Sequence, residues 1–338
     1  MKMTGFDVGR KIGSAMAIAS AATLAVFMTV AHAEQRLRAV AALPPSENTT
    51  DAYKEFINLV NERGKGVVQI DLVGGPEVIP GNQQFDAVRR GAVDVANSPA
   101  GYVLGSFPEV VALVGSTVTP LEARQNGGFE ILQTAFLEKL GVHLLSRLAP
   151  ASEFNLFLVN EPKRTEDGGL DLSGLRIRSS PLFKAFVDAQ NAVPVVVAVP
   201  DIYTGLERGT FDGMGYPVVS LKGFSWERFL KYRIDPGFFQ TDLAIVVNPA
   251  KWEAIGEEGR KILTEVAAEY EQKSYEDFQA LSGRMKSELE EQDGMKTITL
   301  EGEAAEKYLD SAYAAAWDLL KASDSTYYDV LREKFYDR

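Results

Sequence analysis

An internal repeat constrains this 338-residue chain more than any other feature of its sequence. The segments VRRGAVDVANSP (88–99) and LERGTFDGMGYP (206–217) share an Arg-Gly pair, an Asp and a closing Pro. Each shared residue lies 118 positions from its counterpart, as Pro99 does from Pro217. A constant offset of this kind predicts two units that are built alike.

The periodicity around each repeat predicts the same order of elements in both units. Apolar residues recur three and four positions apart before each repeat, which is typical of one face of a helix. Strand-like runs lie on either side of each helix, and the alternation of strand and helix is typical of a mostly parallel sheet with helices on both faces. The sequence therefore predicts an α/β fold with two lobes, each a mixed, mostly parallel sheet flanked by helices. The helices are expected within 51–59 and 181–189, and the flanking strands within 36–43, 66–73, 174–178 and 193–199.

Two such units imply a cleft between them. In open sheets of this type, ligands bind outside the carboxyl ends of the strands. We therefore expect a binding site among the residues that follow the strands. These are residues 44–50, 97–102, 178–180 and 214–217.

The first 33 residues have the pattern of a secretory signal. Lys2, Arg10 and Lys11 precede an Ala-rich apolar run at 15–30, and Ala31-His32-Ala33 is a small-x-small cleavage site. The apolar run is shorter than the ~20 residues that a membrane span needs, which argues against the alternative of an uncleaved anchor. The pattern predicts export to the periplasm, with residues 34–338 as the mature chain.

The charge and the cysteine content exclude some classes of protein. Without residues 1–33 the chain has 32 basic and 46 acidic residues, a balance of −14. Because an acidic surface repels phosphate, nucleic acid is not expected as a partner. The chain has no cysteine, so export brings no disulfide framework.

The division into lobes follows from the repeat and from one long helical pattern. We predict a first lobe at 34–155, completed by about 240–280, and a second lobe at 156–239, completed by about 281–338. The pattern at 257–291 spans roughly 50 Å at 1.5 Å per residue, which is longer than one lobe is wide. We expect it to brace both lobes, although a coiled-coil arm would give the same pattern. With no low-complexity linker, more than one segment is expected to cross between the lobes, as in a hinge.

Catalytic and cofactor motifs are missing from the sequence. There is no Gly-x-Ser-x-Gly elbow, no phosphate-binding Gly-x-x-x-x-Gly-Lys loop, no His-Glu-x-x-His and no dinucleotide-binding glycine fingerprint. His143, the one histidine after residue 33, lies in an apolar run and is expected to be packed. Asp94 and Asp212 are the one alternative, as an acid and base pair in an exported enzyme, but turn-forming hydrogen bonds explain them better. We predict a binding protein with no enzymatic activity, cofactor or metal.

The second repeat also carries a family resemblance. The segment DLSGLRIRSSPLFKAFVDAQNAVPVVVAVPDIYTGLERGTFDGMGYP (171–217) resembles the core of the solute receptors of tripartite ATP-independent periplasmic (TRAP) transporters. Segments 43–75, 81–102 and 248–263 resemble the same family, so the likeness covers essentially the whole mature chain. It implies a receptor, monomeric or dimeric, that captures a small organic acid and delivers it to TRAP permease subunits in the membrane. The alternative is a receptor for an ATP-driven importer, which would lack the long helix.

The resemblance implies that Arg178 binds the carboxylate of the ligand. In the family, the Arg that closes a Gly-Leu-Lys-Ile-Arg strand has this role, and it corresponds to Arg178 and not to Arg176. The position at the carboxyl end of the strand favours the same residue, because a guanidinium group can hold a carboxylate with two parallel hydrogen bonds. Without the resemblance, a surface ion pair would be the simpler interpretation.

Two departures from the family pattern predict a less polar ligand. Met214, Gly215 and Tyr216 stand where the family commonly has Gln-Glu-Asn, and no Arg follows Phe154 where the family often has a second cleft Arg. We therefore expect a monocarboxylate with an apolar or aromatic body. The rings expected around it, some of which are expected to be core, are Tyr216, Phe154, Tyr102, Trp226 and Phe239, with Met214 beside them. Glu47, Asn48, Asn97 and Ser98 are expected to hydrogen-bond the ligand from the first lobe or to cap the helices that follow them.

Overall fold

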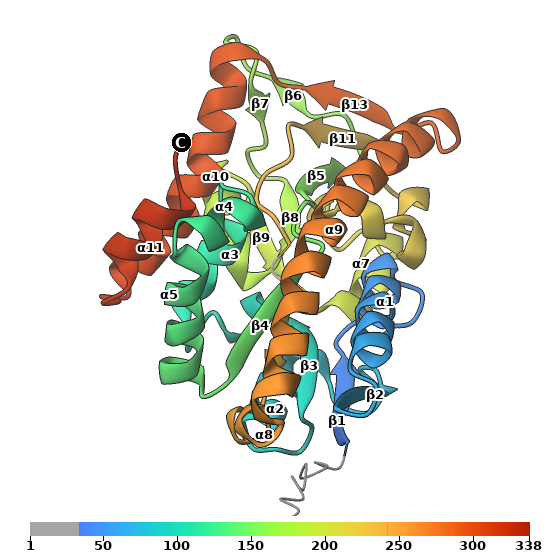
Figure 1. Ribbon diagram of the computed structural model, residues 1–338. Coiled ribbons are helices and arrows are strands. Elements are labelled where there is room, and N and C mark those ends of the chain that lie inside the picture. Colours follow the sequence, from blue (N-terminus) through green and yellow to red (C-terminus); the bar gives the residue numbers. More distant parts are fainter. Residues whose placement is uncertain (1–33, 242) are drawn as a thin grey trace, which may run out of the picture. The chain divides into compact units, whose positions relative to one another are not determined.

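Two mixed β-sheets carry the fold of residues 34–241 and 243–338, which the computed structural model describes (Figure 1). The predicted signal at 1–33 lies outside the described residues. The first sheet has the strand order β2-β1-β3-β12-β4, and the second has the order β13-β11-β5-β10-β8-β9. The strands of the first sheet are β1 (Gln35–Ala41), β2 (Val68–Gly74), β3 (Val95–Pro99), β4 (His143–Leu148) and β12 (Leu243–Val247). Those of the second are β5 (Phe154–Leu158), β8 (Arg176–Ser179), β9 (Val193–Val196), β10 (Gly213–Pro217), β11 (Tyr232–Asp235) and β13 (Lys296–Thr299), with a separate hairpin of β6 (Lys163–Arg164) and β7 (Leu170–Asp171).

The two sheets repeat the same arrangement, which confirms the prediction from the sequence repeat. In the first sheet β1 is parallel to both β2 and β3, and β12 is antiparallel to β3. In the second sheet β8 is parallel to both β9 and β10, and β5 is antiparallel to β10. The strands β5 and β12 are exchanged between the sheets. Strand β5 follows β4 of the first sheet but belongs to the second, and β12 follows β11 of the second sheet but belongs to the first.

The repeated aspartates hold equivalent strand pairs together. The Asp94 carboxylate accepts a hydrogen bond of 2.8 Å from the backbone N–H of Arg38 on β1, and the Asp94 N–H donates to the Arg38 carbonyl at 2.8 Å. Asp212 makes the same pair of bonds with Arg176 on β8, at 2.9 and 2.7 Å. Hydrogen bonds of this local kind explain why the repeat keeps an Asp at this position.

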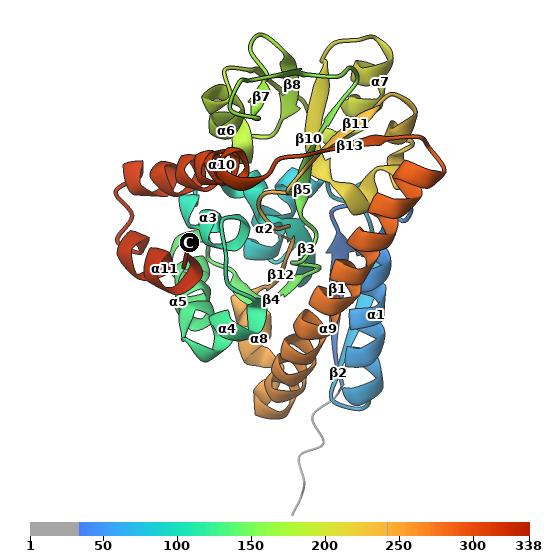
Figure 2. The same cartoon turned by 90° about the horizontal axis from the view of Figure 1, so that it is seen from above.

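Three segments cross between the sheets, in agreement with the expectation of more than one. The first joins β4 to β5, the second joins β11 to β12, and the third is helix α9 (Gly256–Glu291) leading to β13. Helix α9 packs against β4 and against α1 (Asn48–Arg63), and Figure 2 shows it passing beside α1 and ending next to β13. At its far end, Arg233 of β11 donates to the Lys286 carbonyl at 3.3 Å and to Glu290 at 2.9 Å. The long helix therefore braces both lobes.

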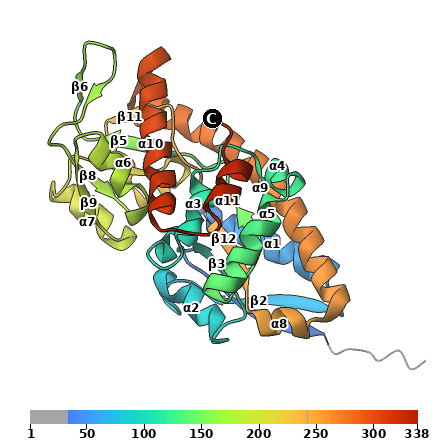
Figure 3. The same ribbon diagram turned by 90° about the vertical axis from the view of Figure 1, so that its left-hand side faces the viewer.

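The remaining helices cover the sheets, and of the last two α10 contacts helices of both predicted lobes. Helix α10 contacts both α6 and α3, whereas α11 packs on α3 and α5 beside the first sheet (Figure 3). The assignment of residues 281–338 to the second lobe stays a prediction, with α11 placed next to first-lobe helices. No described helix combines the length and the apolarity needed to cross a membrane. The helices are α2 (Gln84–Arg89), α3 (Val111–Val114), α4 (Pro120–Gln125), α5 (Gly128–Ala135), α6 (Lys184–Ala189), α7 (Ile202–Glu207), α8 (Pro249–Ala254), α10 (Gly302–Ala322) and α11 (Tyr328–Phe335).

Candidate ligand-binding cleft

A cavity of about 760 Å³ lies where residues of the two lobes meet. All four segments that were expected to follow strands contribute to its wall, while ligand binding by them stays a prediction. Its volume falls within the range of roughly 300–1,000 Å³ that is usual for small-molecule sites. The first lobe contributes Ala42, Leu43, Pro44, Thr49, Pro76, Pro80, Gly81, Asn82, Pro99, Gly101 and Tyr102, with Leu243 at the start of β12. The second sheet and its loops contribute Phe154, at the start of β5, and Arg178, Ser180, Pro181, Leu182, Val196, Val197, Ala198, Val199, Pro200, Tyr216, Pro217, Val219, Ser220 and Phe224, and Thr241 comes from the second crossing segment.

The wall of the cavity is mostly apolar and carries one charged side chain among its described residues. Seven prolines and a group of Leu and Val residues form most of it, and Arg178 is the one charged residue among its described residues. The neutral polar side chains are few and belong to Thr49, Asn82, Ser180, Ser220 and Thr241, besides the two tyrosines. The cleft therefore offers a single strong anchor for an anion.

Backbone carbonyl groups hold Arg178 in place at the end of β8. Its Nε and Nη2 donate to the Val197 carbonyl at 3.1 and 2.9 Å, and its Nη1 donates to the Gly215 carbonyl at 3.3 Å. The residue is only 3% exposed. Burial lowers the pKa of the Arg178 guanidinium, and the neighbouring Tyr216 and Tyr102 act in the opposite direction. Because desolvation disfavours a buried cation, an anion in the cavity would relieve this cost.

Three of the predicted aromatic residues stand on the cavity wall. The Tyr216 ring centroid lies 5.6 Å from Cζ of Arg178, and the Phe154 ring lies 6.4 Å from the Tyr216 ring. Tyr102 faces them from the first lobe, in the short helical turn Ala100–Val103, and is 41% exposed. The structure thus brings Arg178, Tyr216, Phe154 and Tyr102 together, while ligand contact by each of them stays a prediction.

Glu47 and Asn48 connect the two lobes and are not on the cavity wall. The Ser220 hydroxyl donates to Oε2 of Glu47 at 2.6 Å, and Nδ2 of Asn48 donates to the Val219 carbonyl at 2.9 Å. Glu47 precedes α1 but makes no capping hydrogen bond with its side chain, so the capping alternative is wrong for this residue. Burial raises the pKa of the Glu47 carboxyl group to about 7.

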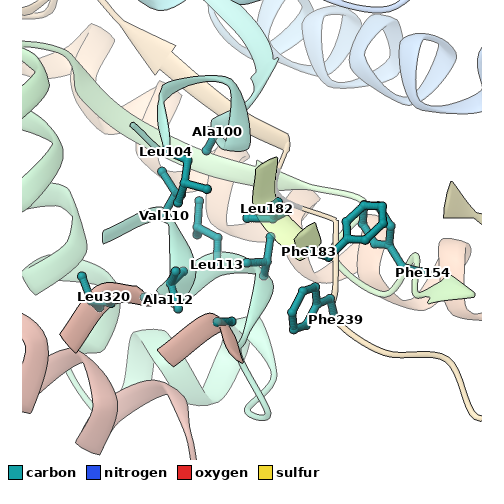
Figure 4. Packing of buried hydrophobic residues seen from close by; sticks show 14 of the residues in the cluster. Ala100, Leu104, Val110, Ala112, Leu113, Phe154, Leu182, Phe183, Phe239 and Leu320 are labelled. Carbon is teal, nitrogen blue, oxygen red and sulfur yellow. The ribbon is translucent and has the colours of Figure 1, made fainter. Parts of the chain in front are cut away.

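The other predicted residues lie in the sheets or in the core. Asn97 and Ser98 are buried in β3, where the Ser98 hydroxyl donates to the Gly81 carbonyl at 3.1 Å. Met214 is fully buried in the core beneath β10. Phe239 belongs to the core cluster that contains Phe183, as Figure 4 shows. The structure places none of these four side chains on the cavity wall, because neighbouring strands and helices cover them.

Sequence reasoning missed several residues of the wall. Val197 to Pro200 line the cavity because β9 ends at Val196, whereas the sequence pattern extended this strand to residue 199. Phe224 was missed as well, and its ring stacks on the predicted Trp226 at 4.3 Å. Trp226 itself is 1% exposed and lies behind Phe224 and Tyr216. The aromatic pair in GFSWERF was the available signal for Phe224.

The catalytic alternative finds no support in the geometry. Asp94 and Asp212 belong to different sheets, are bonded to Arg38 and Arg176 respectively, and do not line the cavity. His143 is stacked on Trp252 at 4.0 Å, and burial lowers the pKa of its imidazole to about 4. Within residues 34–241 and 243–338, no group of acidic or histidine side chains is placed to hold a metal ion.

The two similar lobes, the long bracing helix and the cleft with one buried cation define a two-lobed solute-binding protein. The chain belongs to the bacterial extracellular solute-binding proteins of family 7, whose model matches residues 39–319. These proteins are the receptors of TRAP transporters, which bind small organic acids and work with membrane permease components. The family consists of substrate-binding receptors and not of enzymes.

Individual relatives agree with this assignment. The chain is 28% identical over 260 residues to a 2,3-diketo-L-gulonate-binding periplasmic protein of Escherichia coli (strain K12), covering 73% of this chain and 76% of the relative. It is 23% identical over 301 residues to a monocarboxylate 2-oxoacid-binding periplasmic protein of Nostoc sp. (strain PCC 7120 / SAG 25.82 / UTEX 2576), covering 83% and 80%.

Solved structures share the fold at lower identity. A Bordetella pertussis extracytoplasmic solute receptor binding pyroglutamic acid superimposes with a TM-score of 0.76 at 16% identity, covering 90% of this chain and all of the other. A TRAP solute-binding protein from Desulfovibrio salexigens with bound orotic acid gives a TM-score of 0.77 at 18% identity, covering 89% and 97%.

Proposed function

We propose that this protein is a periplasmic receptor that captures a small organic monocarboxylate with an apolar or aromatic body and delivers it to a TRAP membrane permease. The observation that carries the proposal is the single buried guanidinium of Arg178 in a cavity whose described wall is mostly apolar. One cation matches one carboxylate, and the rest of the wall matches an apolar body. Relatives are named for a sugar acid and for 2-oxo monocarboxylates, and the second class fits this cavity better.

The cost of burying polar groups separates a monocarboxylate from more polar acids. A second carboxylate, or the hydroxyl groups of a sugar acid, would enter a wall with few polar side chains among its described residues. A buried polar group without a hydrogen-bond partner costs about 1–3 kcal/mol, and a charged group costs more. Each unpaired polar group of the ligand weakens binding, whereas burial of the ligand's apolar atoms in the cavity makes the binding free energy more favourable.

Ligand binding is coupled to closure of the lobes about the three crossing segments. The carboxylate is held by Arg178 of the second lobe, and the body of the ligand reaches first-lobe residues such as Leu43 and Tyr102. A ligand shifts a hinge equilibrium only through contacts that differ between the open and closed states. Contacts that both lobes make with the ligand at the same time satisfy this condition. The permease then recognises the closed, ligand-bound form of the receptor.

A thermal-shift screen of organic acids, followed by calorimetry, tests the proposal. A ligand at a hundredfold excess over its Kd stabilises the folded protein by about 2.7 kcal/mol, which is readily seen as a higher Tm. We expect monocarboxylates with apolar bodies to give the largest shifts and to be recovered unchanged after denaturation. The proposal fails if dicarboxylates or sugar acids bind more tightly than every monocarboxylate that has an apolar or aromatic body. Chemical conversion of the bound acid would instead indicate an enzyme.

A further inference from the structure

Phe224 lines the cavity and stacks on a buried tryptophan. Its ring lies against the Trp226 ring at a centroid distance of 4.3 Å and an angle of 13°. Trp226 is 1% exposed, whereas Phe224 is partly buried and lines the cavity. Because Trp226 covers one face of Phe224, the face directed away from Trp226 is the one left to the cavity.

Tyr216 forms a corner with this aromatic pair. Its ring is perpendicular to Trp226, at 4.8 Å and 90°, and to Phe224, at 6.2 Å and 89°. Aromatic rings favour offset-stacked and edge-to-face arrangements. A flat ring placed parallel to Phe224 would stack on Phe224, with its plane perpendicular to that of Tyr216.

The backbone holds the aromatic pair in this position. Ser225 lies between the helical turns Lys222–Phe224 and Trp226–Arg228 and has a φ of 58°, in the left-handed region. Residues two positions apart in a continuous helix do not face each other, so this break is what allows the two rings to stack. A non-glycine residue rarely adopts this conformation, and residues that do are found preferentially at ligand clamps and active sites.

The corner is close to the carboxylate anchor. Cζ of Arg178 lies 5.6 Å from the Tyr216 ring, and Tyr216 is in turn the neighbour of Phe224. A molecule that carries a planar ring and a carboxylate has one group for each of these positions. We propose that Phe224 is a stacking platform and that the ligand is an aromatic monocarboxylate whose ring lies on Phe224 while its carboxylate binds Arg178. This inference rests on the proposed function and narrows its ligand class.

Paired acids that differ only in the ring test the inference. Isothermal calorimetry compares benzoate, phenylacetate and 3-phenylpropionate with their cyclohexyl counterparts. A purely apolar wall favours the cyclohexyl acids, because they have more apolar surface to bury. A platform that stacks on a ring face favours the phenyl acids, and we expect at least one pair to differ by roughly 3- to 10-fold in Kd.

Two leucine variants locate the effect. Phe224→Leu keeps an apolar side chain but removes the ring face, so the phenyl preference should fall below twofold. Phe229→Leu is the matched control, since Phe229 lies in the same segment, packs on Tyr203 at 5.1 Å and does not line the cavity. It should leave the preference unchanged. If Phe224→Leu does not fold, the ratio of the phenyl and cyclohexyl Kd values for the natural chain alone tests the inference.

The outcomes separate this inference from the proposed function. The proposal that Phe224 stacks on the ligand ring is overturned if every pair of acids shows a preference below twofold. It is also overturned if Phe224→Leu keeps the phenyl preference. Tighter binding of an aliphatic monocarboxylate such as a 2-oxoacid also overturns it, while the proposed function stands. If dicarboxylates or sugar acids bind more tightly than all of these acids, both proposals fail.

Discussion

The Ser220 hydroxyl donates a hydrogen bond of 2.6 Å to the buried carboxyl group of Glu47, and this bond joins the two lobes. Ser220 lines the cavity, whereas Glu47 stands at the start of α1 in the first lobe. A side chain added at Gly223 would meet Oε1 of Glu47 at 2.6 Å, so the second lobe closes tightly around this group. Desolvation in this contact is what raises the pKa of Glu47 to about 7.

Replacing Glu47 by Gln should change how stability depends on pH. In the unfolded chain this carboxyl group ionises near pH 4.5, whereas in the folded protein it keeps its proton to about pH 7. The free energy of unfolding therefore falls as pH rises from 4.5 to 7, by about 3 kcal/mol from this group. Urea unfolding at pH 5 and pH 8 should show a smaller fall for Glu47→Gln than for the natural chain. Equal falls would contradict this assignment.

His143 should have the opposite effect over nearly the same pH range. Burial lowers the pKa of its imidazole from 6.5 to about 4, so below pH 6.5 the unfolded chain binds a proton that the folded protein does not. This group therefore lowers the free energy of unfolding by about 3 kcal/mol as pH falls from 6.5 to 4, and its full contribution is present above pH 6.5. His143→Phe keeps a ring against Trp252 and should unfold with a weaker dependence on acid in urea titrations between pH 4.5 and 7. An unchanged acid dependence would argue against a buried neutral imidazole.

Truncation of Arg178 should weaken ligand binding strongly. Loss of one partner of a buried charge pair costs about 2–5 kcal/mol, which corresponds to ~30-fold or more in Kd for Arg178→Ala. Arg178→Lys keeps the positive charge but lacks the planar guanidinium group. Its Kd should therefore lie between that of the natural chain and that of Arg178→Ala. Calorimetry with the best acid from the screen measures the losses, and circular dichroism verifies folding.

Arg176→Ala is the matched control for the Arg178 variants. Arg176 lies on the same strand, pairs with Asp212 at 2.8 Å and does not line the cavity. The affinity of this variant should change by less than about threefold, the scale of a surface ion pair. A loss below threefold in Arg178→Ala would show that Arg178 is not the anchor.

Two glycines should respond in opposite directions to the same substitution. A Cβ atom on Gly213 of β10 would lie 2.5 Å from the Phe157 carbonyl oxygen on the neighbouring strand, so Gly213→Ala should destabilise the fold by roughly 1–3 kcal/mol. Gly283 in α9 has no atom within 4 Å of the same position, and Gly283→Ala should stabilise the helix by about 0.5–1 kcal/mol. Thermal unfolding of both variants measures the difference. A Gly213→Ala protein as stable as the natural chain would contradict the close strand contact.

Local patterns in the sequence were sufficient for the elements and for the two-lobed plan. The helix expected at 257–291 is observed as Gly256–Glu291, and the repeated Asp marks the same strand pair in both sheets. Helix and strand periods are properties of neighbouring residues, and each buried face must be covered by another element. The carboxyl ends of the strands then locate the cleft, and Arg178 stands there with three donor groups on backbone carbonyls.

The tertiary structure alone decided which side chains face the cavity. Met214 and Tyr216 are two positions apart on one strand, yet Met214 is covered by the core and Tyr216 reaches the cavity wall. Phe239 lies in the segment that joins β11 to β12 but is packed in the core, and Glu47 bonds to Ser220, which is 173 residues away. Each of these outcomes depends on contacts between segments that are distant in the chain, such as the exchanged strands β5 and β12, and no local pattern encodes such contacts. The sequence by itself therefore determined the helix and strand pattern, the repeat and the position of Arg178 at the end of its strand, and the packing of the two lobes against each other determined the walls of the site.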